Sequence, residues 1–180
     1  MKYGFIGCGN MGGAIATAMA GITKDMMLSD RSGKAASLAQ TLGCQYGTPA
    51  KTAESCERLF LGVKPQMMAG VLEGLRPVLQ DKMPLLISMA AGLTMQTLEE
   101  MVGTPLPMIR IMPNTPVGVG KGVVLYCANS LVSEAQLQDF LTDMAPCGIL
   151  EAVEEKLFDA AGTVSGCGPA YMYKIGRAHV

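Results

Sequence analysis

Three glycines near the amino terminus have the spacing of a phosphate-binding turn. Gly7, Gly9 and Gly12 form a G-x-G-x-x-G pattern that directly follows an apolar run and opens an alanine-rich stretch. In such a motif the first glycine permits a tight turn, the second lets a pyrophosphate approach the backbone, and the third allows close packing of helix on strand. The helix that follows offers free N–H groups and a partial positive charge to an anion. This pattern, placed between a predicted strand and a predicted helix, indicates a dinucleotide site.

The residues after the second predicted strand give two conflicting indications about the cofactor. Asp30 lies roughly 20 residues beyond the last glycine, where an acid would accept the ribose hydroxyls of NAD. Arg31 and Ser32 follow at once, and an arginine with a hydroxyl neighbour suits the 2′-phosphate of NADP. We expect NADP(H) to be preferred and keep NAD(H) as the alternative. An exposed aspartate beside an arginine is also an ordinary turn.

Three further turns stand at predicted strand ends, where ligands bind in a doubly wound sheet. The first comprises Gly62, Val63, Lys64 and Pro65, in which the proline stops the strand and the lysine is placed to contact phosphate or ribose. The second contains Ala90 and Ala91, whose small side chains would let a flat nicotinamide ring lie against the backbone. The third contains Asn114, which offers both a donor and an acceptor. Each has the alternative interpretation of a simple strand-ending turn.

The hydrophobic pattern predicts the elements that would position these turns. Strands are expected over 2–6, 26–29, 59–63, 85–89, 108–112, 123–127 and 149–153. Helices are expected over 11–20, 34–42 (ended by Gly43), 67–79 (disturbed at Pro77) and 94–101 (capped by Thr94). Another opens with the capping box Ser133-x-x-Gln136, and a last one covers 154–161. The alternation predicts an α/β fold with a Rossmann-type doubly wound, mostly parallel sheet.

Composition excludes several other classes. The chain has 180 residues, 49% hydrophobic and 16% charged, with a net charge of −1. Near-neutrality provides no electrostatic footprint for nucleic acid or an anionic membrane surface. The single histidine, His179, stands at the end, and we expect no metal site. The six cysteines form no CxxC pair, so we interpret them as reduced, non-catalytic thiols of a cytoplasmic protein. The glycines near the amino terminus argue against a signal peptide or membrane span.

Five segments, in order, resemble the pyrroline-5-carboxylate reductase family. They are Gly4–Met11, Val63–Pro65, Ser88–Gly92, Met112–Pro116 and the SGCGPAY segment Ser165–Tyr171. The resemblance covers residues 2 to about 173. It implies NAD(P)H-dependent reduction of 1-pyrroline-5-carboxylate to L-proline, the last step of proline biosynthesis. It also implies a Rossmann domain followed by an all-helical domain that forms a homodimer and completes the active site.

The resemblance carries over several site residues. Cofactor contacts fall on the 62–65 turn, on Ala90 and Ala91, and on the run Ile6, Gly7, Cys8, Gly9, Asn10 and Met11. Glu155 matches a family position near the substrate, and no catalytic residue is assigned beyond it. Its alternative interpretation is a solvated carboxylate in a first helical turn, where the helix dipole favours an acid.

The chain departs from the family pattern in three respects. Asp30 stands where the family often has Ser, Thr or Asn, and Cys167 replaces a serine of the SGSGPAY motif. The chain also stops where the long dimerisation helices should begin. We therefore expect a nucleotide-binding domain over 1–162, the start of a truncated helical domain over 163–174, and a non-native tail over 175–180. Such a chain is expected to bind cofactor weakly and not to reduce the imine.

Two other functions fit part of the pattern. One is a 3-hydroxyacid dehydrogenase-like oxidoreductase, whose opening motif is similar. That enzyme should carry a catalytic lysine in a glycine-rich helix of the later half, and no such segment is present. The other is a non-enzymatic NADP(H)-binding sensor, because a Rossmann fold does not by itself specify a reaction.

Overall fold

The computed structural model describes residues 1–168, 171–172 and 175. Its strands are β1 (Tyr3–Ile6), β2 (Met26–Ser29), β3 (Gln45–Tyr46), β4 (Arg58–Leu61), β5 (Leu85–Ser88), β6 (Met108–Pro113), β7 (Gly122–Ala128) and β8 (Gly148–Ala152). Its α-helices are α1 (Asn10–Met19), α2 (Lys34–Leu42), α3 (Pro49–Ser55), α4 (Pro65–Lys82), α5 (Met95–Val102), α6 (Glu134–Met144) and α7 (Phe158–Gly162). Shorter helical turns are η1 (Thr115–Val119), η2 (Ala145–Cys147), η3 (Glu155–Leu157) and the π-helical η4 (Thr163–Cys167).

The strands form one sheet in the order β3-β2-β1-β4-β5-β6-β7-β8. All neighbouring pairs are parallel except β6 and β7, which are antiparallel. From β1 the chain first adds strands on one side and then returns to add β4 on the other. The point between β1 and β4 is therefore the topological switch point of a doubly wound sheet, where a crevice opens at the carboxyl ends of the strands. The expected Rossmann-type α/β fold is confirmed.

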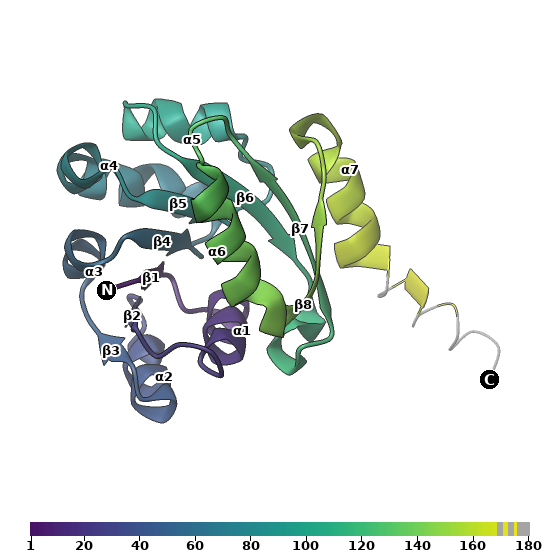
Figure 1. Ribbon diagram of the computed structural model, residues 1–180, viewed down its shortest axis with the longest axis horizontal. Helices are drawn as coiled ribbons and strands as arrows, with labels where there is room; N and C mark the ends of the chain where they lie inside the picture. Colours follow the sequence, from purple (N-terminus) through teal and green to yellow (C-terminus); the bar gives the residue numbers. More distant parts are fainter. Residues whose placement is uncertain (169–170, 173–174, 176–180) are drawn as a thin grey trace.

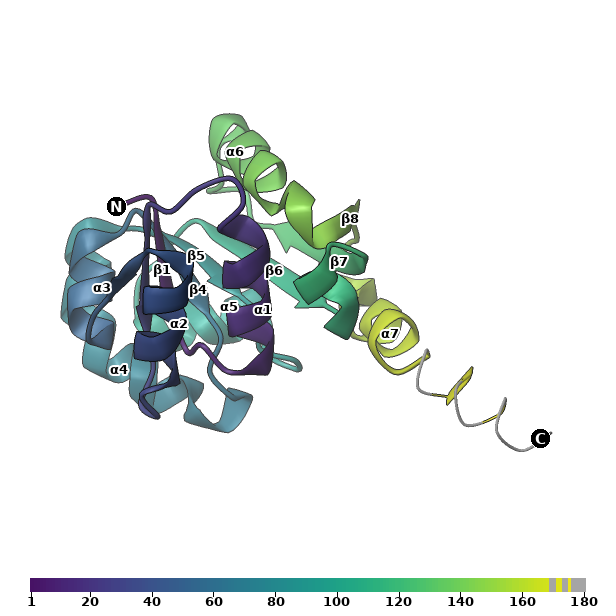
Figure 2. The same ribbon diagram turned by 90° about the horizontal axis from the view of Figure 1, so that it is seen from below.

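Helices cover both faces of the sheet (Figure 1, Figure 2). Side chains alternate along the strands, so Tyr3 and Phe5 of β1 join one core with α1, α2 and α6. Ile6 of the same strand joins a second core with α3, α4 and α5. A smaller cluster lies under α7, where Phe158 packs on Leu125. Strands buried on both faces explain the continuous apolar runs of the sequence.

Local chain chemistry accounts for most helix boundaries. The side chains of Thr94 and Ser133 cap α5 and α6, and the expected capping box with Gln136 is present. Gly43 ends α2 in the left-handed conformation. The helix expected over 67–79 is longer, because α4 continues through Pro77 to Lys82 while Leu75 and Leu79 anchor it in the core. The sequence pattern missed β3 and α3, which are short and lack its periodicity.

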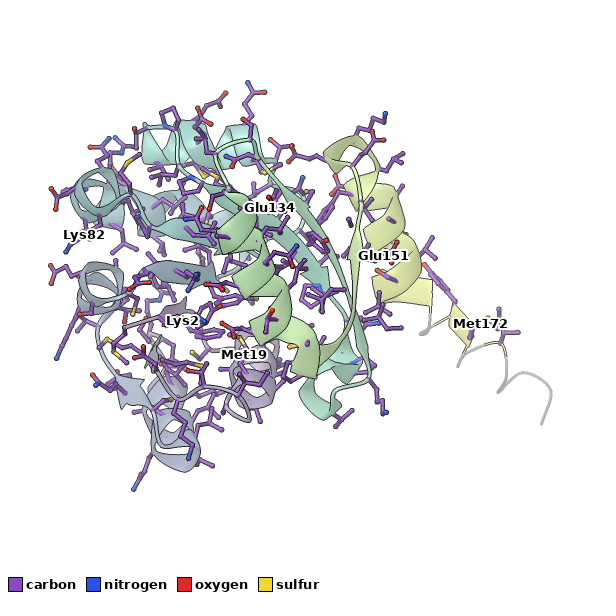
Figure 3. The ribbon with its side chains drawn as sticks, in the orientation of Figure 1. Lys2, Met19, Lys82, Glu134, Glu151 and Met172 are labelled. Atoms are coloured by element: carbon purple, nitrogen blue, oxygen red, sulfur yellow. The ribbon has the colours of Figure 1, made fainter. Side chains whose placement is uncertain are left out.

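The far end of the sheet carries the last described segment. α7 packs on β7, towards the end of the sheet opposite β3 (Figure 1). Met172 is 70% exposed and lies beyond the body of the domain (Figure 3). The expected helical start over 163–174 is described only in part, and the tail over 175–180 lies outside the described residues except for Ile175. None of the described helices combines the length and apolar character that crossing a membrane requires.

Charged and polar side chains join α6 to the amino-terminal edge of the sheet. The Tyr3 hydroxyl donates to Asp143 at 2.6 Å, and the ammonium of Lys2 pairs with the same carboxylate. Arg58 pairs with Asp139 at 2.6 Å one turn away on α6. Burial by itself raises the pKa of the Asp143 carboxyl, but the hydrogen bonds from Lys2 and Tyr3 and the nearby positive charges outweigh it, so its pKa lies below the ordinary value.

We expect Tyr3→Phe to lower the free energy of unfolding by about 1.5–3 kcal/mol, because it removes a buried hydrogen bond to a charged acceptor. Tyr46→Phe is the matched control, since Tyr46 is 49% exposed and should change stability little. Urea unfolding monitored by circular dichroism measures both variants. A loss in Tyr3→Phe no larger than the control would contradict the role of this hydrogen bond.

The same cluster predicts a pH dependence. A carboxyl with a lowered folded-state pKa stabilises the fold fully above its unfolded pKa of about 3.9, and this contribution is lost as the pH falls through the folded value. The difference in free energy of unfolding between the wild-type chain and Asp143→Asn should therefore be constant from pH 5 to 8 and should shrink below about pH 4. Unfolding curves measured across this range give the difference directly.

Candidate functional site

A cavity of about 700 Å³ opens at the switch point between β1 and β4. It lies against the carboxyl ends of β1, β2 and β4 and is bounded by the turns and helices that follow them. It is lined by Ile6, Gly7, Cys8, Gly9, Asp30, Arg31, Ser32, Lys34, Thr48, Pro49, Ala50, Gly62, Val63, Lys64, Met67, Val71, Gly74 and Leu75. This is the place and the size range of a small-molecule site in an open α/β sheet.

Each of the three glycines has a distinct geometric requirement. Gly7 has φ +99°, and a Cβ there would stand 2.6 Å from the backbone of Gly62. A Cβ on Gly12 would stand 2.3 Å from the Gly7 carbonyl oxygen, so the helix can approach the strand only without a side chain. A Cβ on Gly9 would meet nothing within 4 Å. The backbone at Gly9 therefore borders open space, as a position that a pyrophosphate approaches should.

The amino end of α1 is left available to an anion. Its cap is Gly9, no side chain caps the helix, and its first turn contains no acidic residue. α4 starts at the adjacent β4 turn with Lys64 at the cap position, again without a side-chain cap. By contrast, Thr48 caps α3 with its own hydroxyl. The first backbone N–H groups of a helix need partners, and a bound phosphate satisfies them.

The carboxylate of Asp30 is occupied by its own loop. One oxygen accepts from the backbone N–H of Gly33 at 2.9 Å, and the other accepts from the Ser32 hydroxyl at 2.8 Å and from the N–H of Ala35 at 3.1 Å. Asp30 thus closes the turn and caps the start of α2. Two cations, Arg31 and Lys34, lie on the same rim of the cavity.

The structure brings together most of the predicted contact residues, but not all. Seven of them do not line the cavity: Asn10, Met11, Gly12, Pro65, Ala90, Ala91 and Asn114. Asn10 and Met11 form the first turn of α1, and Gly12 packs beneath the turn. The amide of Asn114 is engaged in structural bonds, accepting from the N–H of Val123 at 2.9 Å and donating to the Ser165 carbonyl at 3.3 Å.

Sequence reasoning missed one side of the cavity. This side is formed by Lys34, by Thr48 at the cap of α3, and by residues of α3 and α4, namely Pro49, Ala50, Met67, Val71, Gly74 and Leu75. Lys34 could have been found, because it follows Arg31 and Ser32 closely. The α4 residues could not, because their approach to α3 is a tertiary contact between helices on the same face of the sheet.

Glu155 does not line the cavity and lies in a network of hydrogen bonds further along the sheet. Its Oε1 accepts from the buried guanidinium of Arg110 at 2.8 Å and from the backbone N–H of Met95, the first residue of α5, at 2.7 Å. Its side chain is 32% exposed. The carboxylate is therefore a fixed, partly accessible group and not the freely solvated one of the alternative interpretation.

All six cysteines are free, as expected. Cys8 lies in the glycine-rich turn, and burial is the main cause that raises the pKa of its thiol to about 12. Burial likewise raises the pKa values of Cys56, Cys127 and Cys147 to about 11. A thiol with such a pKa remains protonated at neutral pH, which removes the nucleophilic form.

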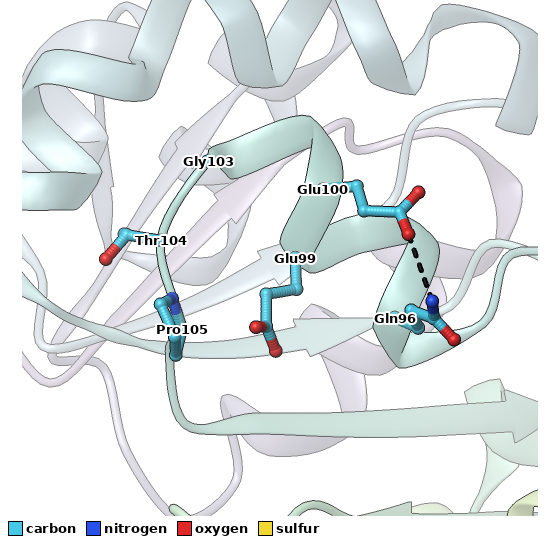
Figure 4. A pocket seen from close by; sticks show the side chains of 6 residues that line it. All are labelled: Gln96, Glu99, Glu100, Gly103, Thr104 and Pro105. Carbon is cyan, nitrogen blue, oxygen red and sulfur yellow. Dashed lines mark hydrogen bonds between the residues drawn. The ribbon is translucent and has the colours of Figure 1, made fainter.

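A second hollow of about 490 Å³ lies beside α5 (Figure 4). Its side chains include Glu99 and Glu100, and Gln96 donates to Glu100 at 3.1 Å. It extends to Gly103 and Pro105, which precede β6 at the amino-terminal edge of the sheet. The edge opposite the glycine-rich turn is not where ligands bind in this fold.

The fold, the three glycines and the uncapped helix define a dinucleotide-binding domain. A family model described as "NADP oxidoreductase coenzyme F420-dependent" matches residues 2–92. Among curated proteins, the chain is 30% identical to the pyrroline-5-carboxylate reductase of Aquifex aeolicus and 33% identical to that of Escherichia coli, over 97% and 96% of this chain. The crystal structure of Plasmodium falciparum pyrroline carboxylate reductase with NADP bound is 34% identical and covers 99% of this chain and 67% of its own, with a TM-score of 0.84.

The chain belongs to the pyrroline-5-carboxylate reductase family. It spans 66% of the length of the two curated relatives. The expected resemblance is confirmed, and the domain is of the pyridine-nucleotide-binding type.

Two glycine substitutions separate binding from folding. Gly9→Ala should leave thermal stability nearly unchanged, because its Cβ points into open space, but should weaken NADPH binding by occupying the approach of the phosphates. Gly12→Ala should lower both thermal stability and NADPH affinity, because its Cβ meets the Gly7 carbonyl. Thermal unfolding and fluorescence titration with NADPH measure the two effects. Unchanged NADPH affinity in Gly9→Ala would remove the glycine-rich turn from the site.

Proposed function

We propose that the protein to which this chain belongs reduces 1-pyrroline-5-carboxylate to L-proline with NADPH. Family membership supports the reaction, and the observation that carries the proposal is the uncapped α1 helix behind Gly9 at the switch point. When bound, the reduced nicotinamide supplies the hydride for the imine carbon, while the ring nitrogen retains a proton to give the amine. The residues of the chain bind the cofactor, orient it towards the imine and shield both from water.

The cavity and the neighbouring elements have distinct proposed roles. The backbone N–H groups at the start of α1 hold the pyrophosphate, with Lys64 as a nearby cation. The small side chains of Ala90 and Ala91 leave room for the nicotinamide after β5. Glu155 presents a carboxylate to the substrate side, where a negative charge favours a protonated imine.

The rim of the cavity favours NADP(H) over NAD(H). Asp30 already caps its own loop, so its carboxylate is not free to accept both ribose hydroxyls. Arg31 and Lys34 leave positive charge at the rim. Lys34 is also the first residue of α2, where the helix dipole disfavours a cation, and a bound 2′-phosphate would offset this repulsion.

We assign residues 1–162 to the nucleotide-binding domain and the segment from 163 to a second, helical unit. In this proposal that unit completes the substrate site and forms a homodimer. Val164 is 74% exposed and Met172 is 70% exposed, which supports an apolar surface that further chain covers.

The reaction is tested by joining residues 1–174 to the C-terminal third of the Escherichia coli relative. We expect this chimera to dimerise and to oxidise NADPH only when 1-pyrroline-5-carboxylate is present, while the 180-residue chain alone stays inactive. A folded, dimeric chimera that binds NADPH without imine turnover would instead favour the sensor function. Turnover of a 3-hydroxyacid with NAD(P)⁺ would favour the dehydrogenase.

Cofactor preference is tested by Arg31→Ala. We expect about 10-fold weaker binding of NADPH and unchanged binding of NADH, because only NADPH carries the phosphate that the guanidinium pairs with. Arg76→Ala is the control, since Arg76 is an exposed arginine on α4 that bonds the Met101 carbonyl. Equal losses for both cofactors would exclude Arg31 from the phosphate site.

A further inference from the structure

Arg110 is a buried cation in the middle of β6 that the cofactor cavity does not use. Its side chain is 3% exposed, and its guanidinium lies 4.7 Å from the centre of the Phe158 ring. It donates to Glu155 at 2.8 Å and, less closely, to Asp159 at 3.4 Å. A buried charge is tolerated when it is paired and hydrogen-bonded, and this one is paired with a single, partly buried carboxylate at close range.

Glu155 connects two parts of the chain that flank the carboxyl edge of the sheet. One is the loop after β5, because Glu155 accepts from the N–H of Met95 at the start of α5. The other is η3, which Glu155 itself begins and which leads into α7. Both bonds go to Oε1, and within the described residues no hydrogen bond reaches Oε2. One oxygen is thus anchored and the other is left available.

The direction of α7 and η4 adds to this arrangement. Phe158 packs over Arg110 at mid-strand, Gly162 lies against Met112, and the Ser165 carbonyl accepts from Asn114 just past the end of β6. The segment therefore runs along β6 towards the carboxyl edge. A change at Arg110 would shift its start and the Glu155 carboxylate together.

We propose that Arg110 is a positioning residue for imine reduction: it holds Glu155 so that one carboxylate oxygen ties the β5–α5 loop to η3 while the other faces the substrate side. The inference rests on the proposed reaction and adds a residue to it. Arg110 touches neither substrate nor cofactor in this role, and it acts through Glu155. A lysine could keep the charge but not the two-pronged donation and the stacking on Phe158.

The chain offers a closely matched control. Arg58 is also a buried arginine on a strand, pairs with Asp139 at 2.6 Å, and lies 5.5 Å from the centre of the Tyr3 ring. It stands at the start of β4, at the edge opposite the glycine-rich turn. Removing either arginine leaves a carboxylate without its buried partner and an aromatic ring uncovered, so both changes should destabilise the fold. Only Arg110 should affect the reaction.

The experiment uses the active chimera and the variants Arg110→Met, Arg110→Lys, Glu155→Gln and Arg58→Met. At temperatures where each variant is folded, Arg110→Met should lower kcat/KM for the imine by up to about 100-fold, with NADPH affinity unchanged. Arg110→Lys should lower kcat/KM for the imine less, and Arg58→Met should keep the kcat/KM of the parent chimera. The double variant Arg110→Met/Glu155→Gln should be no worse than Glu155→Gln alone, because both changes remove one function.

Several results would overturn the proposal. Additive losses in the double variant would show that Arg110 does not act through Glu155. A loss in Arg58→Met equal to that in Arg110→Met would reduce the effect to general destabilisation. A parent chimera without imine turnover would reject the proposed reaction first, and the role of Arg110 in it would be rejected with it.

A second measurement needs no turnover and uses the 180-residue chain. If Arg110 holds Glu155 against α5, the Met95 amide should exchange its hydrogen faster in Arg110→Lys than in the wild-type chain. The Thr97 amide, which donates to Thr94, is the internal control and should keep its protection. Unchanged exchange at Met95 would contradict the positioning role even if Arg110→Met does not fold.

Discussion

The carbonyl oxygen of Gly7 lies where three elements meet with only backbone between them. A Cβ on Gly12 would stand 2.3 Å from this oxygen, and a Cβ on Gly62 would stand 2.4 Å from it. The end of β1, the start of α1 and the turn after β4 can therefore approach one another only because all three positions are glycine. This contact closes the switch point of the sheet and places the open amino end of α1 beside the cavity. A Cβ on the adjoining Gly9 would meet nothing within 4 Å, which separates the packing requirement from the binding requirement.

At the rim of the cavity, the hydrogen bonds of one side chain, Asp30, bear on the proposed cofactor preference. In the sequence, Asp30 competes with Arg31, because an acid suits a ribose diol and a guanidinium suits a phosphate. In the structure, the Asp30 carboxylate accepts three hydrogen bonds from its own loop and caps α2. Turning this carboxylate towards a ribose would cost free energy, because its hydrogen bonds within the loop would be lost. In the structure Asp30 therefore supports the loop that carries Arg31 and Lys34.

The proposed substrate side involves a part of the sheet with a different strand pattern. β6 and β7 are antiparallel, and the chain crosses from β8 through η3 to α7 on the face of the sheet that carries Arg110. Two buried arginines, Arg58 at the start of β4 and Arg110 in the middle of β6, each pair with an acidic side chain of a helical element. One ties α6 to the amino-terminal edge. The other directs α7 towards the carboxyl edge, where the substrate side of the site would form.

The sequence by itself determined the fold class, the glycine-rich turn and most of the element boundaries. Those features are local: glycine spacing, hydrophobic period and capping residues such as Thr94 and Ser133 act within a few positions of the chain. Only the tertiary structure decided that Asn114 is bonded to Val123 and Ser165, that α3 and α4 form one side of the cavity, and that Glu155 joins Arg110 to α5. Each of these depends on residues far apart in sequence that the sheet order brings together. The type of a residue limits the hydrogen bonds that it can make, and its neighbours in the fold determine which of them form.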